Sequence, residues 1–171
     1  MPSAAKQKGN VWEREVAKDL SEVFDENFIR VPNSGAYTGG ANFHRLDRLT
    51  EDQKRMMDGD IMVPPCMSKF KLECKNYKTF DYHKLFTENK TLNKWIKQVE
   101  SGKLWFLIIK VTRKGSYILF HKDIAHYLRF ENYLRYTKNY IIIKYDGFWK
   151  NNADGIRKLN ETYTSKPKSF I

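Results

Sequence analysis

Two acidic residues and a lysine near the middle of the chain have the types and spacing needed for metal-assisted phosphodiester cleavage. Glu73 and Lys75 lie two residues apart in a segment that alternates apolar and charged residues, so in a strand they point the same way, about 7 Å apart. Another apolar segment begins at Asp60. If the two segments pair as antiparallel strands, Asp60 lies beside Glu73, and two carboxylates at an open edge suit Mg²⁺. Lys75 could then orient a water and neutralise charge on a phosphate.

A sheet with flanking helices must hold these residues in place. Apolar spacing predicts helices over residues 10–24, 92–101 and 123–133. Strands are predicted over residues 28–31, 60–63, 70–75, 103–111, 116–120 and 140–145. The polar stretch 33–59, with a short helix over 51–57, is expected to be an insertion near the site. From Phe148 onward we expect a polar tail with one short helix.

Composition and charge indicate a nucleic-acid partner. The 171 residues predict one domain, 1–171, with a core over 8–121 and a basic, aromatic extension over 122–171. Lys and Arg number 31 against 20 Asp and Glu, a net charge of +11, and Lys and Arg displace counterions from phosphates. No apolar run is long enough for a membrane span and the first residues contain no secretory signal, so we expect a cytoplasmic protein with no membrane partner. Neither the two cysteines nor the four histidines have zinc-ligand spacing.

Asp60 and the later Glu73-Cys74-Lys75 together form a pattern that resembles the D…(D/E)xK signature of the restriction-endonuclease-like, or PD-(D/E)XK, nuclease superfamily. The upstream residues are more specifically similar to its Holliday-junction resolvase branch, with a possible viral origin. In that branch, four features follow one another along the chain: an N-terminal Lys-Gly, a helix with an acid, an Arg…Ser-Gly loop and a Gly-Asp. The corresponding residues here are Lys8-Gly9, Glu13-Arg14, Arg30 with Ser34-Gly35, and Gly59-Asp60. The resemblance covers about residues 8–111.

The resemblance implies an α/β (α+β) fold with an αβββαβ core, a central mixed sheet flanked by helices. It implies Mg²⁺ as cofactor, with Mn²⁺ expected to substitute, and DNA as partner. Catalytic roles fall to Glu13, Asp60, Glu73, Lys75 and Ser34, and metal ligation to Glu13, Asp60, Glu73 and the backbone carbonyl of Cys74. DNA contacts fall to Arg14, Arg30, Ser34 and Gln98. The chain departs from the compact resolvase pattern in an insert at about 38–57 and in the segment after His121.

These features lead to a structure-selective DNA endonuclease, a Holliday-junction resolvase that hydrolyses phosphodiester bonds. Two symmetric cuts across a four-way junction require two sites related by a two-fold axis, so we expect a homodimer. One alternative is another nuclease of the same fold, for restriction, repair or viral DNA processing. A non-catalytic nucleic-acid-binding protein is a further alternative.

Structural interpretations stand beside the functional ones. Asn10 and Glu13 fit a helix capping box, in which Glu13 only bonds back to the cap. Glu73 and Lys75 could form a solvated strand face, and Ser34-Gly35 an ordinary turn. Arg14 and Arg30 could be plain surface charges. The aromatic run Tyr127, Phe130, Tyr133, Tyr136 and Tyr140 is expected to pack on the core rather than stack on bases.

Overall fold

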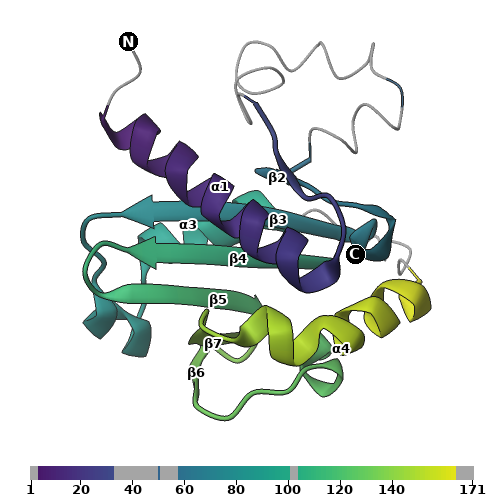
Figure 1. The fold of residues 1–171 in the computed structure, drawn as a ribbon. Coiled ribbons are helices and arrows are strands. Elements are labelled where there is room, and N and C mark those ends of the chain that lie inside the picture. The colour runs from purple at the N-terminus through teal and green to yellow at the C-terminus, as the bar shows by residue number, and fades with distance from the viewer. Residues whose placement is uncertain (1–3, 33–49, 51–57, 101–103, 165–171) are drawn as a thin grey trace.

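A central sheet lies between two helical layers in the computed structural model, which describes residues 4–32, 50, 58–100 and 104–164 (Figure 1). Helices α1 (Ala4–Phe24) and α4 (Phe148–Thr162) cover one face, and α3 (Lys90–Val99) covers the other. This arrangement confirms the predicted α+β class, a mixed sheet flanked by helices. Ser34, most of the insert 38–57 and the short helix expected over 51–57 lie outside the described residues.

The main sheet has five strands in the order β3-β4-β5-β7-β6. β3 pairs parallel with β4, and the other neighbours are antiparallel. A separate two-stranded sheet joins β1 to β2. The strands are β1 (Ile29–Arg30), β2 (Ile61–Met62), β3 (Phe70–Tyr77), β4 (Leu104–Val111), β5 (Gly115–His121), β6 (Tyr133–Tyr136) and β7 (Tyr140–Lys144). Short 3₁₀ helices are η2 (Pro65–Met67), η3 (Tyr82–Phe86) and η4 (Lys122–Tyr127).

Alternation along β3 and β4 divides the core in two. Because successive strand residues face opposite ways, Leu72, Phe106 and Ile108 pack under α1 and α4, whereas Leu107 and Ile109 pack under α3. All four of the side chains Leu72, Phe106, Leu107 and Ile108 are fully buried. β4 is covered on both faces, which explains its unbroken apolar sequence. β3 is therefore an edge strand of this sheet and leaves one side open for other groups.

The expected antiparallel ladder between the segments 60–63 and 70–75 is wrong. β2 instead pairs with β1, in the register Ile29 to Met62 and Arg30 to Ile61. The segment still reaches β3 through a single backbone hydrogen bond, in which the Asp60 N–H donates to the carbonyl of Leu72 at 2.8 Å. The intervening Pro64 and Pro65 begin a 3₁₀ turn instead of a tight hairpin.

The segment after β5 differs from its predicted form. The helix expected over 123–133 is a 3₁₀ helix that ends at Tyr127, and the chain then enters the unpredicted edge strand β6. The tail expected from Phe148 is a helix of 15 residues that buries Phe148, Ile156 and Leu159 on the sheet. Of the aromatic run, Tyr136 is fully buried as expected, whereas Tyr133 is 49% exposed. No helix in the described ranges is long and apolar enough to cross a membrane.

Candidate active site

Asp60 is held at the open edge of β3 by its own backbone and by its carboxylate. Its Oδ2 accepts a hydrogen bond from the Cys74 N–H at 2.8 Å, and its side chain is buried. Gly59 makes this approach possible, because its φ of +90° suits glycine and a Cβ there would lie 2.6 Å from the Leu72 carbonyl oxygen. The Gly-Asp pair therefore has a steric origin: only glycine lets the chain bring Asp60 against β3.

Glu73 and Lys75 share one face of β3, as their spacing predicts. The Lys75 ammonium donates to Glu73 Oε1 at 2.7 Å. The side chain of Lys75 is 18% exposed and that of Glu73 is 15% exposed. Such low exposure does not fit a solvated strand face. On the same face Lys71 pairs with Asp58 at 3.3 Å, a contact that the sequence pattern did not indicate.

Glu13 reaches the same region from α1, which crosses over β3 and β4 (Figure 1). Its Oε2 accepts from Arg30 Nε at 2.5 Å, and Arg30 Nη2 also donates to Asn10 Oδ1 at 2.6 Å. The capping-box interpretation is wrong, because α1 already begins at Ala4 and Asn10 lies inside it. Asn10 was missed as a member of the site because its partner Arg30 comes from a distant strand.

Burial and mutual repulsion shape the charges of these groups. Burial raises the pKa of Glu13 above its ordinary value, Asp60 raises it further, and Arg30 opposes both. Burial likewise raises the pKa of Glu73, the charge of Asp60 raises it further, and Lys75 lowers it. For Lys75, burial alone would lower the pKa, but the charges of Glu73 and Asp60 outweigh it and leave the pKa raised. Asp60 therefore lies within electrostatic reach of both Glu13 and Glu73.

Cys74 can offer only its backbone oxygen to a ligand. Burial raises the pKa of its thiol well above the ordinary value, and the nearby carboxylates add to this, so the sulfur stays protonated. In a strand, the N–H and C=O of one residue point to the same side. Since the Cys74 N–H points at Asp60, its carbonyl faces that open edge too.

The charge balance of the site favours a cation. Three carboxylates (Glu13, Asp60 and Glu73) face two cationic groups (Arg30 and Lys75), and 3 − 2 leaves one excess negative charge in a protein of net charge +11. In the part of the chain that the structure describes, no group of three or more His, Cys, Asp or Glu side chains is arranged to hold a metal ion. The oxygen donors suit a hard cation, and its binding would require Glu13 or Glu73 to turn from its cationic partner.

The remaining predicted site residues lie farther out. Arg14 is exposed on α1, and Arg30 is 18% exposed in its ion pair with Glu13. Gln98 is exposed near the end of α3, where its backbone carbonyl accepts from Lys71 Nζ at 3.0 Å. The DNA contacts assigned to these residues stay predictions. Ser34 lies outside the described residues.

Comparison with protein families gives a match over nearly the whole chain. Residues 4–168 match the protein family described as "Phage putative PDDEXK endonuclease". No curated protein and no solved structure matches the chain. The matched segment spans nearly all of the 171 residues and includes Glu13, Asp60, Glu73 and Lys75. The chain therefore belongs to the phage PDDEXK endonuclease family.

Proposed function

We propose that the protein is a Mg²⁺-dependent, structure-selective DNA endonuclease, a Holliday-junction resolvase that acts as a homodimer. One observation carries the proposal: at the open edge of β3, Asp60 lies within electrostatic reach of Glu13, Glu73 and Lys75, and with Arg30 the group has one negative charge in excess. The fold, the family and the strongly basic charge of +11 agree with an enzyme that acts on nucleic acid.

The oxygen donors for Mg²⁺ would be Asp60, Glu73, the Cys74 carbonyl and Glu13, with Mn²⁺ able to substitute. A bound divalent cation supplies positive charge to the phosphodiester and lowers the pKa of a bound water. Because burial and the charge of Asp60 raise the pKa values of Glu13 and Glu73, a cation that neutralises these carboxylates would be bound more tightly than by an isolated carboxylate.

The protein's own cations have separate roles in this proposal. Lys75 is held by Glu73 next to the acids, where it would orient the attacking water and stabilise charge on the phosphate. Arg30 positions Glu13 by a hydrogen bond from Nε, while Asn10 fixes the other side of its guanidinium. Exposed Arg14 on α1 and Ser34 are proposed to contact the DNA backbone, and Gln98 to contribute from α3.

Junction cleavage is the finer part of the proposal. A resolvase makes two symmetric cuts, so two copies related by a two-fold axis would each contribute one site. The direct test compares cleavage of a four-way junction, a flap, single-stranded DNA and linear duplex, each with and without Mg²⁺. We expect Mg²⁺-dependent cleavage that is fastest on the junction. Equal rates on linear duplex would refute junction selectivity and leave the nuclease assignment intact.

A different DNA-processing nuclease is the second candidate, favoured by the family match, which names a phage endonuclease and no substrate. The same panel separates the two candidates. An enzyme of this second type would cut linear duplex or flaps at least as fast as the junction.

A further inference from the structure

An apolar cavity of about 290 Å³ lies on the α3 side of the sheet, apart from the carboxylates. α3 and η3 cover β3 and β4 on this side, whereas β5 and β7 remain open toward the cavity. Residues that line it include Phe80, Tyr82, Ile109, Tyr117, Tyr133 and Lys144. Its wall thus combines aromatic rings with aliphatic side chains, and a lysine lies at its edge.

The floor of the cavity continues a row of residues that begins at Lys75. In register, Lys75 pairs with Ile109, Ile109 with Tyr117, and Tyr117 with Lys144. Residues directly opposite each other in a sheet share a face, and neighbouring strands lie about 4.8 Å apart. The backbone of Tyr117 is therefore about 10 Å from that of Lys75, and the backbone of Lys144 about 14 Å. A few nucleotides of DNA span this distance, but α3 and η3 cover the row at Ile109, so a strand held at Lys75 has to pass over them to reach the cavity.

Aromatic rings also connect the two places. Tyr77 is two residues beyond Lys75 on the same face, and its ring lies 4.6 Å from that of Trp95. Trp95 stacks on Phe80 at 5.9 Å. Phe80 meets Tyr82 at 5.2 Å in the cavity wall, and the ring of Tyr82 meets that of Tyr117 at 6.1 Å. Tyr77, at the Lys75 end, remains 43% exposed. The ring of Tyr133 packs on Phe130 at 5.4 Å and is not part of this row.

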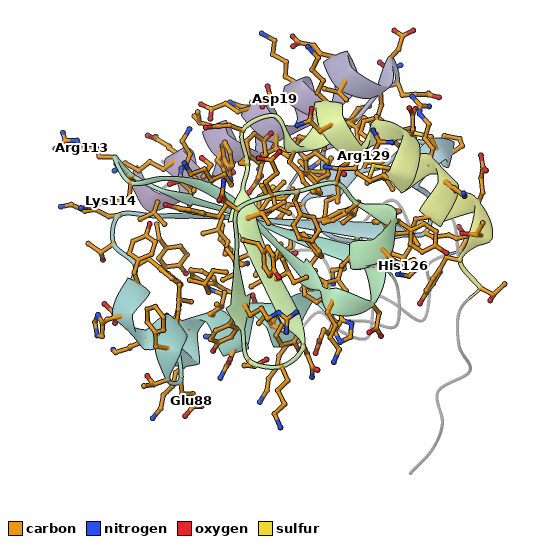
Figure 2. All side chains as sticks on the ribbon, turned by 90° about the horizontal axis from the view of Figure 1, so that it is seen from below. Asp19, Glu88, Arg113, Lys114, His126 and Arg129 are labelled. Carbon is orange, nitrogen blue, oxygen red and sulfur yellow. The ribbon has the colours of Figure 1, made fainter. Side chains whose placement is uncertain are left out.

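The charges at the rim match a polyanion. Lys144 is exposed at the cavity edge. Arg113 and Lys114 form the tip of the β4–β5 hairpin and project into solvent (Figure 2). The Tyr117 hydroxyl donates to the carbonyl of Lys114 at 3.0 Å, which ties the hairpin tip to the cavity. Aromatic rings beside lysine and arginine are what a single-stranded nucleic acid requires, because bases stack and phosphates pair with the cations.

We propose that this cavity binds an unpaired nucleobase of the DNA substrate, a few nucleotides from the bond that is cut. The proposal rests on the nuclease function proposed above and narrows its substrate class to DNA with unpaired bases beside the cleavage site. In a fully paired duplex the bases stack on one another and cannot enter, so the cavity would favour branched or gapped DNA.

The test measures binding without cleavage, in EDTA, with the full-length protein. The probes are a gapped DNA that carries 2-aminopurine in the gap and a fully paired duplex of the same length. Tyr117→Ala should weaken binding to the gapped DNA about tenfold, because one stacked base is lost, and should change duplex binding less than twofold. Tyr117→Phe keeps the ring and should bind as the wild type does. The 2-aminopurine emission should be quenched by the wild type and by Tyr117→Phe, and less by Tyr117→Ala.

Matched variants separate the cavity from general surface effects. Phe86 is 84% exposed and does not line the cavity, so Phe86→Ala should leave both affinities unchanged. Lys144→Ala should weaken gapped-DNA binding more than Lys138→Ala, which removes the same charge from the β6–β7 turn. Melting temperatures check that each variant folds.

Two results would overturn the proposal. One is an equal effect of Tyr117→Ala on gapped and duplex DNA, including no effect on either. The other is a loss of self-association in Tyr117→Ala by sedimentation with unchanged DNA binding, which would make the cavity an interface between copies of this chain. The proposed nuclease function fails on a different readout, the absence of Mg²⁺-dependent cleavage on every substrate. The two failures are therefore distinguishable, because one is read from binding in EDTA and the other from cleavage in Mg²⁺.

Discussion

Glu13→Gln separates a catalytic carboxylate from a structural one. Gln keeps an oxygen that can accept from Arg30 Nε but removes the charge. A charge-assisted hydrogen bond contributes about 1 kcal/mol more than a neutral one, so this exchange should cost about 1 kcal/mol. The loss is partly offset, because the buried carboxylate no longer repels Asp60. For a chain of this size we expect the melting temperature to fall by about 2–4 °C.

That cost cannot unfold the protein at the assay temperature. If the wild-type stability is at the low end of about 5–15 kcal/mol, the variant still has about 4 kcal/mol, and only about 0.1% is unfolded. A fall in cleavage by orders of magnitude would therefore reflect lost metal binding and not lost structure. The assay is single-turnover cleavage of labelled four-way junction in Mg²⁺, together with thermal melting of the same sample.

Glu15→Gln is the matched control. Glu15 lies on the same helix and forms an ion pair with Lys110 of β4, away from Asp60 and Glu73. Glu15 and Lys110 are both more exposed than Glu13 and Arg30, so the loss of their ion pair should cost at most about 0.5 kcal/mol and leave cleavage unchanged. Wild-type cleavage by Glu13→Gln, or an equal loss in Glu15→Gln, would refute the catalytic assignment of Glu13.

Three further predictions concern two glycines with close backbone neighbours and one buried tyrosine. Gly59→Ala should destabilise the protein by about 1–3 kcal/mol and slow cleavage strongly, because a Cβ 2.6 Å from the Leu72 carbonyl oxygen would displace Asp60. Cleavage at the wild-type rate would contradict this prediction. Gly155→Ala would stabilise a solvent-exposed helix by about 1 kcal/mol, but here it should destabilise α4, because the Cβ would lie 2.1 Å from the Tyr127 carbonyl oxygen. The folded variant should still cleave DNA, and a higher urea midpoint than that of the wild type would contradict the prediction. Burial and the hydrogen bond to Asp19 raise the pKa of Tyr145 above its ordinary value near 10, so the stability that the neutral hydroxyl contributes is complete below about pH 10 and is lost as the pH rises further. Urea unfolding at pH 8 and pH 10.5 should show that Tyr145→Phe loses less stability than the wild type between these pH values, and equal losses would refute the link between Tyr145 ionisation and stability.

Local patterns were enough to predict the elements that carry the chemistry. The alternation of β3 placed Glu73 and Lys75 on one face, and helical spacing found most of α1 and α3. Both patterns report burial of one side of an element, which a single segment already encodes. The position of Asp60 beside β3 was also expected, although the supposed strand ladder was replaced by one hydrogen bond from its N–H.

Contacts between distant segments were not predictable in the same way. Two buried asparagines made α4 appear to be a polar tail, but Asn152 bonds the backbone of Arg129 and Asn160 accepts from the Lys69 N–H. The spacing of Phe148, Ile156 and Leu159 was the signal that could have revealed this helix. The pairing of Arg30 with Glu13 and Asn10 likewise depends on β1 lying against α1, which no local pattern specifies.

The most direct test of the central claim is the nicking of supercoiled plasmid by the wild type and by Asp60→Asn. Asn at this position can still accept from the Cys74 N–H, so the variant should keep its fold by circular dichroism. The account predicts that the wild type nicks the plasmid in Mg²⁺ and not in EDTA, and that Asp60→Asn is slower by orders of magnitude. Equal nicking by the two proteins, or wild-type nicking that persists in EDTA, would contradict the claim that Asp60 belongs to a metal-dependent nuclease site.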